Sequence, residues 1–286
     1  MTIEMGYIGL GNIGKPMCET LLKNGQEHNV AVTAYDVFDE PVNALVEQGA
    51  SRASSLAELA RKCLVIGVCV RDDNDVDALL YGGEGLLENA KAGTVIAIHS
   101  TVTRDNTVRW AQDAAVKNID IIDAAITGGP HGAAAGELGI MVGGTDEALA
   151  KAQLMLDLTS KVVVHGGPVG SGVVLKLANN LMNYLAFTAA VEGVSLVEKA
   201  GLDPQKLLEI GHANQVVQPM MHMFISGRIG LKAGCTPEEA ASIFAPPAGL
   251  AEKDLDHTLE LAEQLGVDIP VTASNRKRIA HTFLQQ

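Results

Sequence analysis

The stretch Ile8-Gly9-Leu10-Gly11-Asn12-Ile13-Gly14 lies between an apolar run, Glu4–Ile8, and an amphipathic pattern that begins at Pro16. Its glycines fit the spacing GxGxxG. The first permits a tight turn, the second lets the backbone approach a pyrophosphate, and the third lets helix and strand pack closely. Pro16 is suited to a first helical turn, whose free N–H groups attract phosphate. The stretch predicts a dinucleotide-binding βαβ unit from Ile3 to Asp36.

Asp36 follows the next apolar run, Ala31–Tyr35, and lies 22 residues beyond Gly14. A carboxylate at this spacing accepts hydrogen bonds from the adenosine ribose hydroxyls, and its charge repels a 2′-phosphate. The next residues, Val37-Phe38-Asp39-Glu40, offer no basic replacement. We therefore expect NAD in preference to NADP. The other interpretation of Asp36 is a turn residue that ends a strand.

Short apolar runs alternate with amphipathic stretches through the first half of the chain. This alternation predicts a parallel sheet with helices on both faces. The expected strands are Glu4–Ile8, Ala31–Tyr35, Leu64–Val70, Val95–Ile98, Ile119–Ala124, Gly139–Val142 and Val162–Val164.

Beyond Gly166-Gly167 the pattern is helical throughout. One long helix is expected from Val173 to Ala200, closed by Gly201. Others are expected at Asp203–His212, Pro237–Phe244, Gly249–Leu265 and Thr272–Leu284. We therefore expect an α/β fold, with an N-terminal Rossmann-type doubly wound sheet in residues 1–166. An all-α domain in residues 167–286 would be joined to it by the long helix.

Composition excludes several classes of protein. The formal charge is −13 over 286 residues, and no Lys/Arg cluster exists beyond Arg276-Lys277-Arg278, which argues against nucleic acid and anionic membrane as partners. No apolar run reaches transmembrane length, and the first residues lack a signal-peptide pattern, so we expect a cytoplasmic protein. The eight histidines show no metal-binding spacing, so no metal site is expected.

The segment Asp123-Ala124-Ala125-Ile126-Thr127-Gly128-Gly129 ends a strand and enters a loop rich in glycine and alanine. Thr127 and the backbone N–H groups of Gly128 and Gly129 could form a small concavity for a carboxylate. Taken alone, these residues fit a flexible strand-end loop equally well.

Lys176 stands at i, Asn180 at i+4 and Asn183 at i+7 of the long helix, so the three share one face. Their neighbours are apolar, and a lysine buried there needs partners or a lowered pKa. Such a lysine can act as general acid/base on an alcohol while hydride leaves carbon. A surface lysine that extends to solvent is the alternative, which the polar stripe argues against. Lys253-Asp254-Leu255, by pattern alone, predicts only a solvated helix face.

These segments together resemble the β-hydroxyacid dehydrogenase family. Gly9 to Met17 matches its GLGxMGxPM opening, Ser100-Thr101 its ST pair and Asp123 to Gly129 its DAPVSGG loop. Gly170 to Asn180 matches GxGxxxKxxNN, and Lys253-Asp254-Leu255 matches the late KDL motif.

The resemblance implies a two-domain enzyme in which Lys176 is the general acid/base and a small carboxylate is the substrate. It implies homodimers or homotetramers formed through the helical domain. The substrate would contact Ser100, Thr127, Gly128, Gly129 and Asn180. The cofactor would contact Gly9, Leu10, Gly11, Asn12, Ile13, Asp36, Val70, Arg71, Thr101 and Lys253.

The sequence departs from the family pattern at several positions. Ala125 and Thr127 replace the usual Pro and Ser, Ile98 replaces an Asp, and Val70-Arg71 replaces Leu-Pro. The segment from Gln215 to Pro247 departs most, and we interpret its Met- and Phe-rich stretch as core packing rather than the lining of a larger pocket.

The leading hypothesis is the NAD-dependent oxidation of a 3-hydroxy carboxylate to its semialdehyde or 3-oxo acid, or the reverse reduction. An imine reductase on the same fold is a second hypothesis, which Lys176 argues against. A cofactor-binding sensor without turnover is a third, which the intact lysine and substrate loop argue against.

Overall fold

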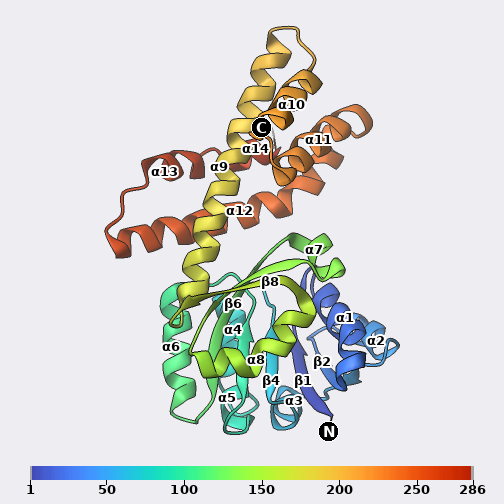
Figure 1. Ribbon diagram of the computed structural model, residues 1–286, viewed down its shortest axis with the longest axis vertical. Coiled ribbons are helices and arrows are strands. Elements are labelled where there is room, and N and C mark those ends of the chain that lie inside the picture. The colour runs from blue at the N-terminus through green and yellow to red at the C-terminus, as the bar shows by residue number, and fades with distance from the viewer. Residues whose placement is uncertain (1, 285–286) are drawn as a thin grey trace. The chain divides into compact units, whose positions relative to one another are not determined.

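The computed structural model describes residues 2–284, with all of their side chains except those at 228, 230–233 and 237. The chain forms two compact units, Met1–Lys176 and Leu177–Gln286 (Figure 1). The boundary expected at residue 166 lies one residue before the end of the last strand, β8 (Ser160–Gly167). The first unit of the structure extends further, because it also includes the first turns of the long helix α9 (Ser171–Lys199).

The first unit is built on one eight-stranded sheet. Its order is β3-β2-β1-β4-β5-β6-β7-β8, and all neighbouring pairs are parallel except β6 with β7. The direction of strand addition reverses between β1 and β4, the point at which dinucleotides bind in doubly wound folds. The strands are β1 (Ile3–Ile8), β2 (Val30–Tyr35), β3 (Ser51–Arg52), β4 (Val65–Val68), β5 (Val95–Ile98), β6 (Asp120–Thr127), β7 (Leu138–Gly143) and β8 (Ser160–Gly167).

Helices cover the sheet in two layers. α1 packs against α2, α7 and α8, whereas α3 and α4 pack against α5. The main core contains buried Met5, Tyr7, Leu21, Val95 and Ile140, in keeping with the apolar runs of parallel strands. The helices are α1 (Gly14–Gly25), α2 (Asp39–Val46), α3 (Leu56–Lys62), α4 (Asp73–Leu80), α5 (Leu86–Asn89), α6 (Arg104–Ala115), α7 (Gly129–Ala135) and α8 (Asp146–Thr159), with a 3-10 turn at Gln26–His28.

The sheet confirms the predicted fold class and all seven expected strands, with two corrections. β7 is antiparallel to β6, because the short connection through α7 returns the chain along the same edge. β3 was not expected, because two exposed residues at a sheet edge carry no hydrophobic periodicity.

The second unit is all helical, as predicted. It contains the remainder of α9, α10 (Pro204–Ala213), α11 (Pro219–Gly234), α12 (Pro237–Leu265), α13 (Pro270–Arg276) and α14 (Ile279–Leu284). One buried cluster includes Tyr184, Leu255 and Phe283. Among the described residues, no helix has the length and apolar character needed to cross a membrane.

Three helix predictions in this unit need correction. The break expected between Phe244 and Gly249 is absent: α12 continues through Pro246-Pro247, because Ala248 and Ala251 are buried in the same cluster as Leu255. The stretch Thr272–Leu284 divides into α13 and α14. The Met-rich stretch forms α11, a helix that the expected ranges did not include.

Phe224 of α11 bears out the interpretation of this stretch as core. Its ring stacks on Phe187 with centroids 4.5 Å apart, and it meets Phe283 edge to face at 5.3 Å. Met221 packs against a second buried cluster around Leu208 and Ile225. Met220 and Met223, by contrast, are exposed, so the interpretation holds for part of the stretch only.

Candidate active site

The three glycines of the loop between β1 and α1 differ in what a side chain would meet. Gly9 has φ +89°, and a Cβ there would lie 2.2 Å from the carbonyl oxygen of Cys69. A Cβ on Gly14 would lie 2.0 Å from the carbonyl oxygen of Gly9, so these two glycines are needed by the fold itself. A Cβ on Gly11 would meet nothing within 4 Å. Gly11 thus leaves an open approach to the backbone, which fits a bound pyrophosphate.

Asp36 lies at the end of β2 beside this loop. Its Oδ2 accepts a hydrogen bond of 2.6 Å from the backbone N–H of Leu10, and its Oδ1 accepts one of 2.9 Å from Phe38. An ionised carboxylate has about four acceptor positions, so about two remain for ribose hydroxyls. Asp36 therefore links the end of β2 to the glycine loop by a hydrogen bond, and it keeps acceptor positions that an adenosine ribose could use.

The loops after β4 and β5 are joined by the predicted site residues Val70 and Ser100. The buried Ser100 hydroxyl accepts a hydrogen bond of 2.8 Å from the Val70 N–H. Thr101 is half-buried next to it. Arg71 forms an ion pair of 2.7 Å with Asp75 on α4, and its side chain is 85% exposed. The Arg71 guanidinium is therefore held by its ion pair with Asp75 and not by burial at the predicted site.

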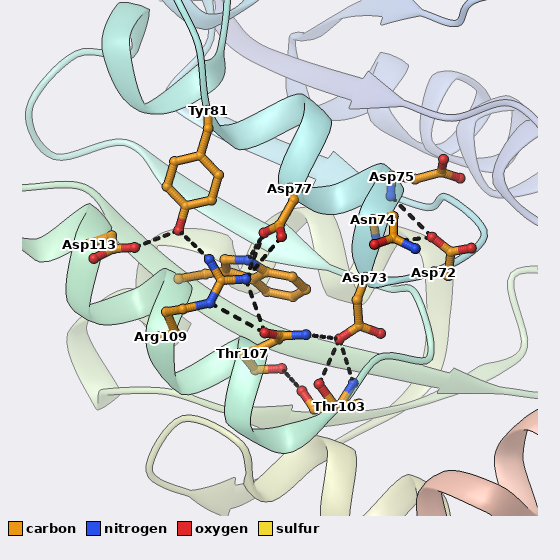
Figure 2. Close-up of polar contacts among 12 residues, drawn as sticks. Asp72, Asp73, Asn74, Asp75, Asp77, Tyr81, Thr103, Thr107, Arg109 and Asp113 are labelled. Atoms are coloured by element: carbon orange, nitrogen blue, oxygen red, sulfur yellow. Dashed lines mark hydrogen bonds and ion pairs between the residues drawn. The ribbon is translucent and has the colours of Figure 1, made fainter.

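A polar network fixes the same two loops to each other (Figure 2). The Oδ1 atom of Asp73, at the start of α4, accepts hydrogen bonds from the N–H and hydroxyl of Thr103, at 3.0 and 2.7 Å, and from Asn106, at 2.6 Å. One turn further along α4, Asp77 accepts two hydrogen bonds from Arg109 of α6, at 2.8 and 3.1 Å. The network holds α4 and α6, and with them the loops that carry Val70 and Thr101.

His99 precedes Ser100 and is completely buried. Its Nδ1 atom lies 2.9 Å from the carbonyl oxygen of Ala124, and its ring stacks on Tyr7. Burial lowers the pKa of His99 to about 4, so the ring is neutral at physiological pH. We therefore assign His99 to the core beneath the site and not to the chemistry.

Asp123 is the residue that holds the beginning of α9. It points from β6 and is 1% exposed; its carboxylate accepts hydrogen bonds from the N–H groups of Gly170, at 2.7 Å, and Val173, at 2.8 Å. Burial raises the pKa of Asp123, while these hydrogen bonds act to lower it. Asp123 therefore satisfies donors that a helix start leaves unpaired, and Lys176 follows Val173 by three residues.

The glycines around Asp123 make room for this contact. Gly170 has φ +92°. A Cβ on Gly172 would lie 2.3 Å from the carbonyl oxygen of Met141 and 2.8 Å from Asp123 Oδ2. A Cβ on Gly143 would lie 2.4 Å from Asp123 Oδ1. The Gly-Ser-Gly segment before Lys176 is thus required for close packing of the helix start on β6 and β7.

Thr127, Gly128 and Gly129 lie at the end of β6, where the chain turns into α7. Gly128 has φ +121° and Gly129 has φ +63°, and a Cβ on Gly129 would meet nothing within 4 Å. Thr127 is half-buried. The turn is thus open on the Gly129 side, which allows a small ligand to approach its backbone.

Asn180, on α9 in the second unit, is held by the buried Asp254 of α12. Its Nδ2 atom donates a hydrogen bond of 2.7 Å to Asp254 Oδ2, and Tyr184 OH donates one of 2.9 Å to the same oxygen. Burial, followed by the charge of Asp254, raises the pKa of Tyr184, which therefore remains a donor. Lys176 is half-buried one turn before Asn180 on the same helix face.

Asp254 corrects the pattern-based prediction of a solvated face at Lys253-Asp254-Leu255. Asp254 is 1% exposed and Leu255 is fully buried, while Lys253 is half-buried. The acidic neighbours Glu252 and Asp256 made the stretch look solvated, but both pair with Arg276. The sequence signal that points to Asp254 is the KDL match, in which it is the second residue.

The predicted site residues whose side-chain hydrogen bonds are given above thus fall into two groups, one in each unit. In the first unit, Asp36 is bonded to Leu10, and Ser100 to Val70, at the carboxyl edge of the parallel strands. In the second unit, Asn180 is hydrogen-bonded to Asp254, which follows the predicted site residue Lys253. Within residues 2–284 no group of three or more His, Cys, Asp and Glu side chains could hold a metal ion.

Comparison with known proteins places the chain in a family. Residues 4–167 match the model described as the NAD binding domain of 6-phosphogluconate dehydrogenase. Residues 170–285 match the model described as NAD-binding of NADP-dependent 3-hydroxyisobutyrate dehydrogenase. Together the two models span nearly all of the chain and meet at the start of α9.

Individual relatives agree with these models. The chain is 34% identical to 2-(hydroxymethyl)glutarate dehydrogenase of Eubacterium barkeri over 277 residues, which cover 95% of this chain and 86% of that protein. Mycobacterium tuberculosis 3-hydroxyisobutyrate dehydrogenase, solved with L-serine, has the same fold, with a TM-score of 0.81, 24% identity and coverage of 98% and 93%. An imine reductase from Pseudomonas sp. shares the fold with a TM-score of 0.65, 22% identity and coverage of 99% of both chains. The chain belongs to the β-hydroxyacid dehydrogenase family of nicotinamide-dependent oxidoreductases.

Proposed function

We propose that the protein catalyses the NAD-dependent oxidation of a 3-hydroxy carboxylic acid to its semialdehyde or 3-oxo acid, or the reverse reduction. The observation that carries the proposal is the presence of Lys176 and Asn180 on one face of α9, just beyond a helix start that Asp123 holds. The name of the Eubacterium barkeri relative supports it, because 2-(hydroxymethyl)glutarate is itself a 3-hydroxy acid.

Lys176 is the proposed general base in the oxidative direction. The substrate hydroxyl gives its proton to the neutral Lys176 amine as hydride leaves the same carbon, and the reverse reaction returns that proton from the ammonium. The nicotinamide, when bound, supplies the acceptor or donor of the hydride. No other described residue needs to change its protonation state in this scheme.

The turn at Thr127-Gly128-Gly129 is the proposed site for the substrate carboxylate. Backbone N–H groups in a turn with positive φ, together with a hydroxyl, form a concavity that suits an anion. The open side at Gly129 supports this assignment. Ser100 is proposed to contact the substrate as well, through its hydroxyl proton, since its oxygen already accepts from Val70.

Asp36 supports NAD as the preferred cofactor. Its carboxylate is fixed beside the glycine loop, and Val37 and Phe38, which follow it, are exposed and uncharged. Arg52 lies on the neighbouring strand, but its guanidinium bonds Asp39 at 2.8 Å and Asn43 at 2.6 Å. A 2′-phosphate would therefore face a carboxylate with the nearby guanidinium already paired.

The test is a substrate screen with the purified protein, with NAD or NADP in the oxidised form for the hydroxy acids and in the reduced form for the semialdehydes and imines. Absorbance of the reduced nicotinamide then rises or falls with turnover. The panel contains 3-hydroxyisobutyrate, 2-(hydroxymethyl)glutarate, L-serine, the corresponding semialdehydes and cyclic imines. We expect turnover of a 3-hydroxy acid, and a fall of kcat by about 100-fold or more in Lys176→Ala with unchanged NAD affinity. Turnover of imines alone, or full activity of Lys176→Ala, would refute the proposal.

We also propose that the protein forms a homodimer or homotetramer through its helical unit. The exposed large apolar side chains of that unit, which include Met182, Leu196, Ile210 and Met223, support this proposal, because such residues are costly to leave in water. Light scattering on the purified protein should give a mass of two or four times 29.9 kDa. A monomeric mass at micromolar concentration would refute it.

A further inference from the structure

Asp254 is a buried carboxylate that accepts hydrogen bonds from one side-chain amide and one tyrosine hydroxyl. It lies on α12, 74 residues from Asn180 in sequence, and both residues are buried. Its Oδ2 atom receives hydrogen bonds from Asn180 Nδ2 and from Tyr184 OH. Placing a carboxylate out of water is unfavourable unless it gains compensating interactions, so a residue of this kind needs a reason in addition to packing.

The hydrogen-bond chemistry fixes the orientation of the Asn180 amide. An ionised carboxylate can only accept, so the amide atom 2.7 Å from Asp254 must be the NH2 group. The second hydrogen of this group is directed to Tyr184 OH at 3.5 Å, whose own proton is given to Asp254. Asp254 therefore takes one donor of the Asn180 amide, and Tyr184 OH is a more distant partner for the other.

The carbonyl oxygen of Asn180 consequently keeps acceptor capacity. It receives only a long hydrogen bond of 3.3 Å from Asn179 Nδ2 among the contacts of the described residues, and a carbonyl oxygen has two lone pairs. A group that meets this oxygen must bring a proton. A substrate carboxylate has none, whereas a hydroxyl or an ammonium does.

We infer that Asp254 is a positioning residue that turns the Asn180 amide so that its carbonyl oxygen accepts a hydrogen bond from the reacting hydroxyl or from the Lys176 ammonium. This inference rests on the proposed function, because it assumes that Lys176 and Asn180 face the substrate. It gives Asn180 the role of an acceptor that orients the reacting O–H or N–H. The substrate carboxylate then belongs to the turn at Thr127 and not to Asn180.

The second oxygen of Asp254 supports a role beyond a tie between helices. Asp254 Oδ1 is shielded from solvent and has no hydrogen-bond partner within the described part of the chain. A buried acceptor without a donor costs about 1–3 kcal/mol, so its presence in a folded protein calls for a reason beyond packing. A contact whose only purpose was to fasten α9 to α12 would be satisfied by a neutral, fully paired side chain.

A reciprocal exchange tests the polarity of the pair. Asn180→Asp alone places two carboxylates in contact, and we expect kcat to fall by about 100-fold. Adding Asp254→Asn restores a hydrogen bond from an amide NH2 to a carboxylate, and the carboxylate now at position 180 still offers an acceptor. We expect the exchanged pair to recover at least about tenfold in kcat over Asn180→Asp. If the substrate needs a donor at position 180, the exchange recovers nothing, and the inference is wrong.

A double-mutant cycle tests whether Asp254 acts through Asn180. We expect Asp254→Asn to lower kcat by about tenfold or more, and Asn180→Ala by at least as much. Asp254→Asn should then cause less than about a twofold further loss in the Asn180→Ala background. Losses that multiply, or an unchanged kcat in Asp254→Asn, would overturn the inference.

Thr188→Val is the matched structural control. Thr188 lies on the same helix, two turns beyond Asn180, and donates a hydrogen bond of 2.6 Å to the buried Asn275. Its loss should lower the melting temperature but leave kcat within about twofold. A fall in kcat equal to that of Asp254→Asn would show that any weakened contact of α9 has the same effect, against our inference.

Two further measurements separate the inference from the proposed function. NAD affinity, measured by calorimetry, should be within about twofold of the wild type in all variants. The wild type must turn over a 3-hydroxy acid, and Lys176→Ala must not; if either condition fails, the proposed function fails. If both hold and the exchange gives no recovery, only the role of Asp254 is refuted.

Discussion

Removal of the Asp123 carboxylate should weaken the fold and misplace Lys176 together. Asp123→Ala leaves the N–H groups of Gly170 and Val173 without their present acceptors, at a position where the side chain is 1% exposed. A buried donor left unpaired costs about 1–3 kcal/mol, so the two together predict a loss of about 2–6 kcal/mol in the free energy of unfolding. Water that enters the space left by the carboxylate would bring the loss toward the lower value.

The consequence for catalysis comes from the distance along the helix. Lys176 lies less than one turn beyond Val173, so a helix start that frays or shifts moves the Lys176 amine with it. A displacement of about 1 Å at a reacting group costs about 100-fold in rate. We therefore expect kcat of Asp123→Ala to fall by about 10- to 100-fold while the affinity for NAD changes little, because the glycine loop lies on a different strand.

The assay compares urea unfolding, followed by circular dichroism, with kcat and NAD affinity. Asp120→Asn is the matched control, because Asp120 lies on the same strand but forms a surface ion pair of 2.9 Å with Lys151. Exposed pairs of this kind contribute about 0–1 kcal/mol. If Asp123→Ala is no less stable than Asp120→Asn, or keeps wild-type kcat, the anchoring role of Asp123 is refuted.

Three further predictions concern the first unit. His99 has a pKa of about 4 against 6.5 in an unfolded chain, so the unfolded chain takes up the proton first as the pH decreases. The free energy of unfolding of the wild type should therefore fall by about 3 kcal/mol between about pH 6.5 and about pH 4, and urea unfolding of His99→Phe should lack this loss. Gly14→Ala should prevent stable folding, because its Cβ would lie 2.0 Å from a backbone oxygen. Gly11→Ala should keep the melting temperature of the wild type, but its affinity for NAD, measured by calorimetry, should be about tenfold weaker. Asp36→Ala should reduce the preference for NAD over NADP by about tenfold in kcat/KM; an unchanged ratio would remove Asp36 from cofactor selection.

The sequence predicted best what depends on local chemistry. The glycine spacing placed the turn after β1, and the apolar runs placed seven strands, because buried parallel strands are continuous in their hydrophobic residues. The helix face with Lys176 and Asn180 followed from spacing alone. These features need no knowledge of distant contacts.

Features that depend on distant partners could not be predicted in this way. The continuation of α12 through Pro246-Pro247 follows from burial of Ala248 and Ala251 against other helices. Asp254 looked like one more acid on a charged face, because its partner Asn180 lies 74 residues away. Asp123 was matched to a substrate loop, yet its carboxylate holds residues 47 and 50 positions later. In each case the tertiary contact outweighs the local pattern.

Asp123 and Asp254 act on the same helix at positions on either side of Lys176. Asp123 fixes the backbone of the first turn of α9, and Asp254 fixes a side chain less than three turns later. Burying two carboxylates is a large cost that apolar residues would avoid. Apolar contacts have no preferred direction, so they set the rotation of a helix less closely than hydrogen bonds do. Hydrogen bonds to a buried charge are strong and directional, so they restrict that rotation. In the proposed reaction a proton leaves the substrate hydroxyl while hydride leaves the carbon that bears it. The base must then be placed within such limits, which is a physical reason for the helix that carries Lys176 to be held by charge.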